Sequence, residues 1–241
     1  GSGSSGSGML IPLPEPPPPS SGSLTPPGFA PRQTPDPTPK PEPTPVPTPE
    51  QPIVIDPKKI NKDRMQEIIK KGQTAPDITF PDVSPDSWSY EAISEASRMG
   101  IIQGYSDGSF KPNDTVTRAE FASMVVRAFG IDATGSSSFS DTQDSWAAGA
   151  IEALRELDVI SGYGDGTFRP NQEITRTEMI VMLARALGVA NVESALTQFT
   201  DDVAIPAWGK GAVEALRERG IVTGRSNNSF APNDQATRAE A

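Results

Sequence analysis

Three arginines stand in the same short context, Thr-Arg-x-Glu, at Arg118, Arg176 and Arg238. A guanidinium binds a carboxylate through two parallel hydrogen bonds, so arginine is well suited to the recognition of anionic groups. Each of these arginines follows a residue that is typical of a helix start, where exposed amides and the helix dipole attract anions. The three positions therefore predict carboxylate binding. The alternative is that each arginine pairs with a neighbouring carboxylate of the chain itself.

Three tryptophans recur in step with the arginines, at Trp88, Trp146 and Trp208. The face of an indole can stack on the apolar face of a sugar ring, and an indole is also large enough to anchor a hydrophobic core. The sequence favours neither role over the other, and both stay open at this point.

An Asp-Gly pair lies between a tyrosine and a phenylalanine at two places, Asp107-Gly108 and Asp165-Gly166. This combination predicts a tight turn, within a short hairpin. Because glycine lets a backbone approach a ligand closely, Gly108 and Gly166 join the candidate binding residues, together with Asp107 and Asp165. The aspartates are expected mainly to stabilise their own turns.

The elements that position these residues are predicted to be helices. In a capping box, the threonine hydroxyl accepts a hydrogen bond from the third helical amide, and the glutamate carboxylate accepts one from the threonine amide. Apolar residues such as Phe121, Met124 and Val125 follow at helical spacing, and another apolar helical pattern follows each tryptophan. The predicted capping residues are Thr117, Glu120, Thr175, Glu178, Thr237 and Glu240.

Four markers recur three times in the same order, at intervals of roughly 60 residues: Phe-x-Asp, tryptophan, the glycine-containing turn and Thr-Arg-x-Glu. They predict three tandem units over residues 79–131, 132–190 and 191–241, each built as helix, tight turn or short hairpin, and helix. The expected fold class is mainly α. The third unit ends just after its capping box and therefore lacks most of its last helix.

Two other segments precede these units. Residues 1–52 are rich in Gly and Ser at first and then hold most of the 26 prolines of the chain. This composition predicts a flexible linker, because proline removes backbone donors and favours an extended chain. Residues 53–78 are predicted to form a short polar helix with a lead-in to the first repeat.

The composition excludes several classes of function. The 241 residues include neither Cys nor His, so there is no disulfide, no thiolate metal site and no histidine-based catalysis. A net charge of −10 argues against nonspecific binding to nucleic acid or to anionic membranes. No apolar run approaches the ~20 residues that span a bilayer. We expect no enzymatic activity, no cofactor, no metal and no membrane insertion.

Together, the Phe-x-Asp, the Trp-led helix, the Gly-Tyr-x-Asp-Gly-x-Phe turn and the Thr-Arg-Ala-Glu helix start resemble the S-layer homology (SLH) domain over residues 79–241. The resemblance implies a pseudo-threefold assembly whose grooves bind a pyruvylated secondary cell-wall polysaccharide attached to peptidoglycan. It also implies a secreted protein at the bacterial cell surface, in the cell wall or S-layer of Gram-positive and related bacteria. An upstream cargo or S-layer domain would be fused to it. The three motif arginines would hold the carboxylate of the pyruvate ketal.

The third repeat departs from this pattern, because Arg225 and Asn227-Asn228 replace the tyrosine and the Asp-Gly pair. Asparagine also tolerates the left-handed backbone region, so the turn is expected to persist. The acidic side chain is lost, and the last helix is mostly missing. We therefore expect the third groove to be the poorest binding site.

Two other functions are weighed against this reading. A calcium-dependent or protein–protein interaction module is suggested by the Asp-Gly turns, yet each turn offers one aspartate where an EF-hand loop needs several oxygen ligands. A glycosidase needs two carboxylates about 5–9 Å apart on either side of the bond it cleaves. The pair Asp201-Asp202 consists of adjacent residues and does not fit that geometry.

Overall fold

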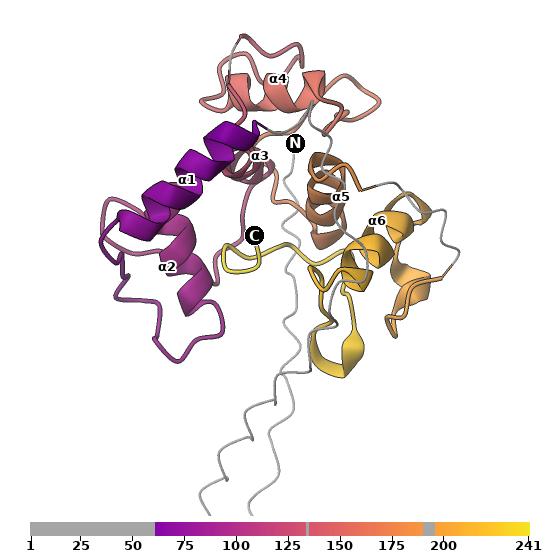
Figure 1. The fold of residues 1–241 in the computed structure, drawn as a ribbon. Helices are drawn as coiled ribbons and strands as arrows, with labels where there is room; N and C mark the ends of the chain where they lie inside the picture. Colours follow the sequence, from indigo (N-terminus) through magenta and orange to yellow (C-terminus); the bar gives the residue numbers. More distant parts are fainter. Residues whose placement is uncertain (1–60, 134, 190–195) are drawn as a thin grey trace, which may run out of the picture. The chain divides into compact units, whose positions relative to one another are not determined.

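The computed structural model describes residues 61–133, 135–189 and 196–241, all within one compact unit. The linker predicted for 1–52, and the lead-in before residue 61, lie outside the described residues. Within the described part there are six α-helices, two short 3-10 helices and no β-strand (Figure 1). The prediction of a mainly α fold is confirmed.

The first helix of each repeat follows or contains its tryptophan. These helices are α2 (Tyr90–Met99), α4 (Ala148–Glu156) and α6 (Ala207–Glu218). Their equivalent residues Ile93, Ile151 and Val213 are buried in the core. Helix α2 ends where the sequence predicts, because Gly100 adopts a left-handed conformation with φ 76° and closes the last turn.

The second helix of the first two repeats begins at the Thr-Arg-x-Glu motif. Helices α3 (Arg118–Ala128) and α5 (Arg176–Ala186) both have complete capping boxes, made by Thr117 with Glu120 and by Thr175 with Glu178. Helix α3 packs against α4, and α5 packs against α6. In the third repeat, Thr237 and Glu240 make the equivalent hydrogen bond of 3.0 Å between amide and carboxylate, and a turn follows.

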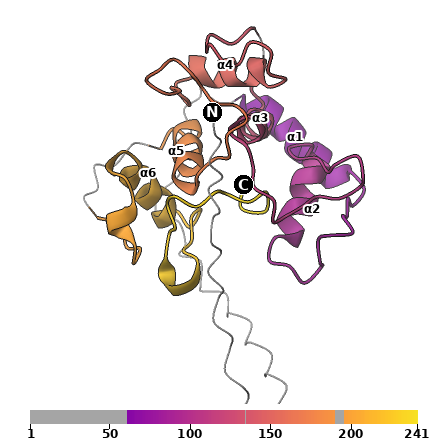
Figure 2. The same ribbon diagram turned by 180° about the vertical axis from the view of Figure 1, so that it is seen from behind.

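The pseudo-threefold arrangement is visible in one ring of hydrogen bonds. The Val116 amide donates to Ala236, the Ala236 amide donates to Ile174, and the Ile174 amide donates to Val116, at 2.9–3.0 Å. All three side chains are fully buried. Each repeat therefore contacts both of the others through the residue that immediately precedes its Thr-Arg-x-Glu motif. In both views of the ribbon, the C-terminal end lies near the centre, beside α2, α3 and α5 (Figures 1 and 2).

The Phe-x-Asp marker fixes the turn between the two helices of its repeat. The Asp82 carboxylate accepts hydrogen bonds from the amides of Phe110, at 2.9 Å, and Lys111, at 2.7 Å. Lys111 has a positive φ of 57°, so the carboxylate holds a backbone conformation that lysine rarely adopts. The ring of Phe80 packs on that of Phe110 with 5.3 Å between centroids. The other two repeats have the same arrangement, centred on Asp141 and Asp201.

The turn of the third repeat persists despite its different sequence. Asn227 and Asn228 adopt left-handed conformations with φ 59° and 54°, as expected, within the 3-10 helix η2 (Ser226–Asn228). The other 3-10 helix, η1 (Asp202–Ala204), leads into α6. The amide of Arg225 donates to the Ser229 carbonyl at 2.7 Å, and the first two turns have the same closing bond.

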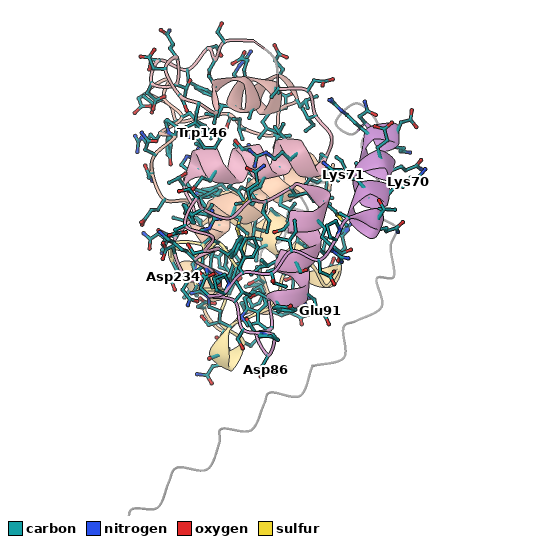
Figure 3. The ribbon with its side chains drawn as sticks, turned by 90° about the vertical axis from the view of Figure 1, so that its left-hand side faces the viewer. Lys70, Lys71, Asp86, Glu91, Trp146 and Asp234 are labelled. Atoms are coloured by element: carbon teal, nitrogen blue, oxygen red, sulfur yellow. The ribbon has the colours of Figure 1, made fainter. Side chains whose placement is uncertain are left out.

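Helix α1 (Lys62–Thr74) precedes the repeats and lies within residues 53–78. The Asn61 side chain caps it by accepting a hydrogen bond from the Arg64 amide at 3.1 Å. The helix packs on α2 at Gly72, where a side chain would meet Met99 at 2.5 Å. Its polar side carries Lys70 and Lys71 (Figure 3), and the Lys71 ammonium lies near Gly100 at the end of α2.

Candidate functional site

The motif arginines leave their own repeat and enter the next one. Arg118 Nε donates to the Phe168 carbonyl at 2.8 Å, and its Nη1 lies 2.9 Å from Glu178 Oε1. The guanidinium also lies over the rings of Tyr163 and Phe168, 4.9 and 4.6 Å from their centroids. Only 6% of Arg118 is exposed. Arg118 therefore joins the second helix of one repeat to the turn and helix cap of the next.

The same contact recurs around the pseudo-threefold axis. Arg176 donates to the Phe230 carbonyl and to Glu240, both at 2.8 Å. Arg238 donates to the Phe110 carbonyl at 2.9 Å and lies 3.8 Å from Glu120. The third arginine thus returns to the first repeat and closes the ring. The three equivalent arginines are buried to similar extents.

The amides at these helix starts are also occupied. The Arg118 amide donates to the Gln172 carbonyl at 2.9 Å, and the Ala119 amide donates to the Pro170 carbonyl at 3.0 Å. The next amide, of Glu120, donates to the Thr117 hydroxyl. The helix starts were expected to offer open amides to an anion, but in the structure the first two amides bind the following repeat and the third binds the capping threonine.

Glu178 is the centre of the polar cluster between the first two repeats. Its carboxylate accepts hydrogen bonds from the Thr175 amide at 3.0 Å and the Tyr163 hydroxyl at 2.7 Å, and it pairs with Arg118. Burial alone would raise the pKa of Glu178, but these donors and the Arg118 charge hold the pKa below its ordinary value. The carboxylate is thus ionised and fully engaged at neutral pH.

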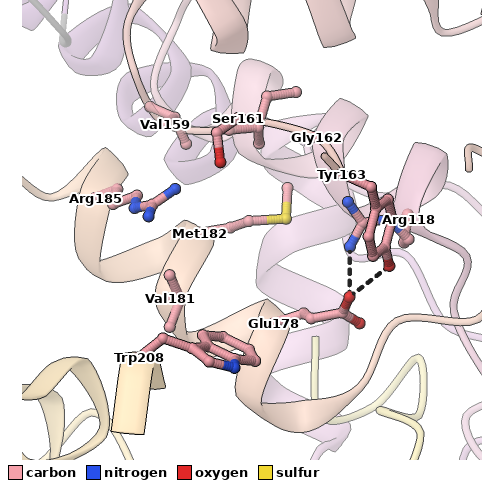
Figure 4. A pocket seen from close by; sticks show the side chains of 11 residues that line it. Arg118, Val159, Ser161, Gly162, Tyr163, Glu178, Val181, Met182, Arg185 and Trp208 are labelled. Atoms are coloured by element: carbon pink, nitrogen blue, oxygen red, sulfur yellow. Dashed lines mark hydrogen bonds and ion pairs between the residues drawn. The ribbon is translucent and has the colours of Figure 1, made fainter. Parts of the chain in front are cut away.

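A pocket of about 410 Å³ opens beside this cluster (Figure 4). Arg118, Tyr163 and Glu178 lie together on one side, and Met182 lies beside them on α5. Trp208, from the first helix of the third repeat, also lines the pocket. Its other lining residues are Val159, Ile160, Ser161, Gly162, Val181 and Arg185.

A second pocket, of about 160 Å³, repeats this construction one repeat earlier. Arg238, Tyr105 and Glu120 correspond to the polar cluster of the larger pocket, and Trp146 corresponds to its tryptophan. The remaining lining residues are Ile102, Gln103, Gly104, Ser123, Met124 and Arg127. The two pockets therefore share the sequence positions that form them, so both derive from the repeat itself.

The tryptophans are largely exposed. The exposed fractions of Trp88, Trp146 and Trp208 are 76%, 66% and 55%. None of the three therefore anchors the core, and the open choice between core and surface is decided for the surface. Trp146 and Trp208 line the two pockets, whereas Trp88 lines neither.

The Asp-Gly pairs lie outside the linings of both pockets, although the tyrosine that begins each turn belongs to a lining. The carboxylate of Asp107 accepts hydrogen bonds from the amide and hydroxyl of Ser109, at 2.9 and 2.6 Å, and Asp165 binds Thr167 in the same way. The aspartates thus stabilise their own turns, as expected. Gly108 and Gly166 have positive φ values of 82° and 79° and lie at the turn tips. None of these four residues lines either pocket.

In the third repeat, Arg225 takes the place of the tyrosine. Its Nη2 lies 2.8 and 3.0 Å from the two carboxylate oxygens of Glu240. Arg176 pairs with the same carboxylate from the preceding repeat. Two arginines therefore share the Glu240 carboxylate here, whereas Glu178 in the second repeat binds one arginine and the Tyr163 hydroxyl.

Sequence reasoning missed the residues that complete the pockets, above all Arg127 and Arg185. Each is the tenth residue after the capping threonine of its helix, and this shared register was a signal in the repeats. The tyrosines of the turns gave a second signal, because they recur in the two repeats whose turns line this pair of pockets. The partners of the motif arginines could not be found this way, since they lie in another repeat.

The structure offers no support for a metal site in the described ranges, where no group of three or more acidic side chains is placed to hold an ion. Among the helices described, none is both long and apolar enough to cross a membrane.

Comparisons with known proteins identify the family to which this fold belongs. The sequence model of the S-layer homology domain matches residues 79–122, 138–180 and 198–241, which together make up more than half of the chain. These three matches coincide with the three repeats.

Several relatives share this region. An amylopullulanase of Thermoanaerobacterium thermosulfurigenes is 40% identical over 171 residues, which cover 68% of this chain and 9% of that enzyme. An S-layer protein of Bacillus thuringiensis subsp. finitimus is 33% identical over 166 residues, 68% of this chain and 20% of that protein. A cellulosome-anchoring protein of Acetivibrio thermocellus is 33% identical over 139 residues, 54% of this chain and 30% of that protein.

The chain spans less than a third of the length of each of these relatives. The family match and the surface-layer relatives locate it at the cell surface, in association with the cell wall. The chain belongs to the S-layer homology domain family.

Proposed function

We propose that this chain is a noncatalytic anchoring module that binds a pyruvylated secondary cell-wall polysaccharide and so holds a fused upstream cargo or S-layer domain on the peptidoglycan. The relatives support this role, since one is named as a cellulosome-anchoring protein and another as an S-layer protein. The match to the amylopullulanase covers 9% of that enzyme, which is consistent with an accessory module.

The observation that carries the proposal is the duplicated pocket. Each copy combines an exposed tryptophan, a methionine and a cluster of arginine, tyrosine and glutamate. A pyranose ring has an apolar face that stacks on an indole and hydroxyl groups that bond to polar side chains. A volume of about 410 Å³ in the larger pocket is within the usual range for small-ligand sites.

Arg118 and Arg238 line the two pockets, which supports a contact with the ketal carboxylate. Arg176 occupies the equivalent position between the second and third repeats. Because each guanidinium is largely buried and already bonded, its contribution is to present remaining donors from a fixed position. The local cations act at short range, so the net charge of −10 does not prevent binding, since the Debye length is only ~8 Å at physiological salt.

The test is sedimentation of the protein with purified cell-wall sacculi, before and after chemical removal of the pyruvate ketals. The proposal expects binding to intact sacculi and a large loss when the ketals are removed. Binding that is equal in both preparations would retain the anchoring role and transfer recognition to neutral sugars. If a folded protein does not bind intact sacculi, the anchoring function is wrong.

A further inference from the structure

The polar cluster of each pocket supplies little net positive charge. Arg118 and Glu178 form an ion pair at 2.9 Å and both line the larger pocket. Arg238 and Glu120 line the smaller pocket together in the same way. In each pair the two formal charges cancel. A ligand carboxylate placed against the cluster would meet a glutamate as well as an arginine, so recognition of an anion needs a further cation.

In both pockets, such a cation lies on the helix that also carries the glutamate of that pocket. Arg185 is in the last turn of α5 and Arg127 is in the last turn of α3, and both are exposed. Figure 4 shows Arg185 across the pocket from Arg118 and Glu178, with Met182 between them. Both arginines are exposed to solvent, and Arg127 Nη1 donates to the Ile101 carbonyl of its own repeat at 3.4 Å, so each guanidinium presents donors at the pocket surface.

A basic residue in the last turn of a helix also has an ordinary explanation, since it favourably opposes the helix dipole. Arg98, Arg155 and Arg217 occupy such positions on the first helices. These three do not line either pocket, whereas Arg127 and Arg185 do. The helix dipole therefore explains why a cation stands at the end of a helix. The pockets give a separate reason for the arginines at the ends of α3 and α5, because these two line a pocket.

We propose that Arg127 and Arg185 are the specificity-determining cations of the two pockets, each binding the carboxylate of an acidic sugar whose ring stacks on Trp146 or Trp208. The motif arginines hold the glutamate and tyrosine of the pocket wall in place and present their remaining donors beside these cations. This inference rests on the proposed function and names which side chains read the negative charge of the polysaccharide.

The decisive variant is Arg127→Ala with Arg185→Ala, compared with wild type on sacculi with and without their ketals. We expect its affinity for intact sacculi to fall roughly tenfold to hundredfold, as for loss of charged hydrogen bonds. Removal of the ketals should then cause little additional loss. The variant Arg127→Lys with Arg185→Lys should keep part of the discrimination, because the charge remains while the two-point geometry is lost.

Lys71→Ala is the matched control, since Lys71 is also an exposed cation in the last turn of a helix, α1, and lies well apart from Trp146 (Figure 3). It should bind like wild type. If the double alanine variant keeps the ketal dependence of wild type, the inference is wrong while the anchoring function stands. If wild type itself does not bind intact sacculi, the proposed function fails first. Circular dichroism of each variant separates lost binding from lost folding.

Discussion

The Arg118 guanidinium and the Glu178 carboxylate meet at 2.9 Å, although 60 residues separate them in the chain. Glu178 also completes the capping box of α5. The first residue of α3, Arg118, thus pairs with the capping glutamate of α5, the equivalent helix of the next repeat. Since the pattern continues through Arg176 with Glu240 and returns through Arg238 to the first repeat, the three repeats are joined in a closed ring.

This pairing predicts that Arg118→Ala lowers the stability of the whole fold. The substitution leaves a largely buried carboxylate without its cation and removes the bond to the Phe168 carbonyl. The free energy of unfolding should decrease by about 2–4 kcal/mol, near the lower end for a broken buried pair because Tyr163 still binds Glu178. Urea denaturation measures the change. Arg169→Ala, at an exposed ion pair with Asp165, should change stability by well under 1 kcal/mol.

A second prediction concerns the aspartate of each Phe-x-Asp marker, whose carboxylate accepts hydrogen bonds from two amides of the turn. Asp141→Ala removes the acceptor of the Phe168 and Arg169 amides, both at 2.8 Å, and Arg169 has a positive φ of 60°. A loss of about 1–3 kcal/mol is expected, together with faster hydrogen exchange of these two amides. Asp144→Ala, in the same loop, is the control. Unchanged exchange at Phe168 would show that the turn holds without the carboxylate.

Local and distant contacts differ in how far the sequence could predict them. The capping boxes of α3 and α5 were predictable because a threonine and a glutamate three residues apart act within one helical turn. The C-terminal end of α2 at Gly100 and the turn at Asn227 follow from similarly local rules. The partners of Arg118 were not predictable, because Phe168 and Glu178 come near only when the repeats close into a ring.

The pockets were partly predictable. The tryptophans were recognised as candidates, yet only the fold shows that Trp146 and Trp208 face a pocket while Trp88 does not line either one. Arg185 had a sequence signal in its shared register with Arg127, but a basic residue near a helix end is common and gives little reason to expect a ligand. Asp107 and Gly108 were correctly placed in a turn, but neither residue lines either of these pockets, whereas Tyr105 of the same turn does.

Acid should weaken the fold through Glu152. Its carboxylate binds Arg155 and the amide of Ser138, and this hydrogen bonding lowers its pKa from 4.5 to about 2 despite the opposing effect of burial. A depressed folded-state pKa means that the stabilisation is present above about pH 4.5 and is lost as the pH falls toward 2. Glu152→Gln should therefore be less stable than wild type at pH 7, and the difference should shrink by pH 3. A constant difference in urea midpoints would contradict this assignment.

Chelation of divalent cations should leave folding and wall binding unchanged. The carboxylate of Asp107 is engaged by the amide and hydroxyl of Ser109, and that of Asp165 by Thr167, so the turns close without an ion. The melting temperature and the sacculus-bound fraction would be measured with EDTA and with added calcium. A calcium-dependent shift in either would revive the calcium-dependent interaction module.

The two pocket tryptophans should affect binding while the fold remains intact. Trp146 and Trp208 are more than half exposed, so replacing both by Ala removes only part of the area that a buried indole would contribute, and the unfolding free energy should decrease by about 2–4 kcal/mol. Loss of the stacking surface should weaken binding to sacculi whether or not the ketals are present, because the sugar ring is common to both. Trp88→Ala is the matched control, since Trp88 is the most exposed of the three and lines neither pocket. If Trp88→Ala weakens binding as strongly as the double variant, the glycan must also contact a surface outside the two pockets.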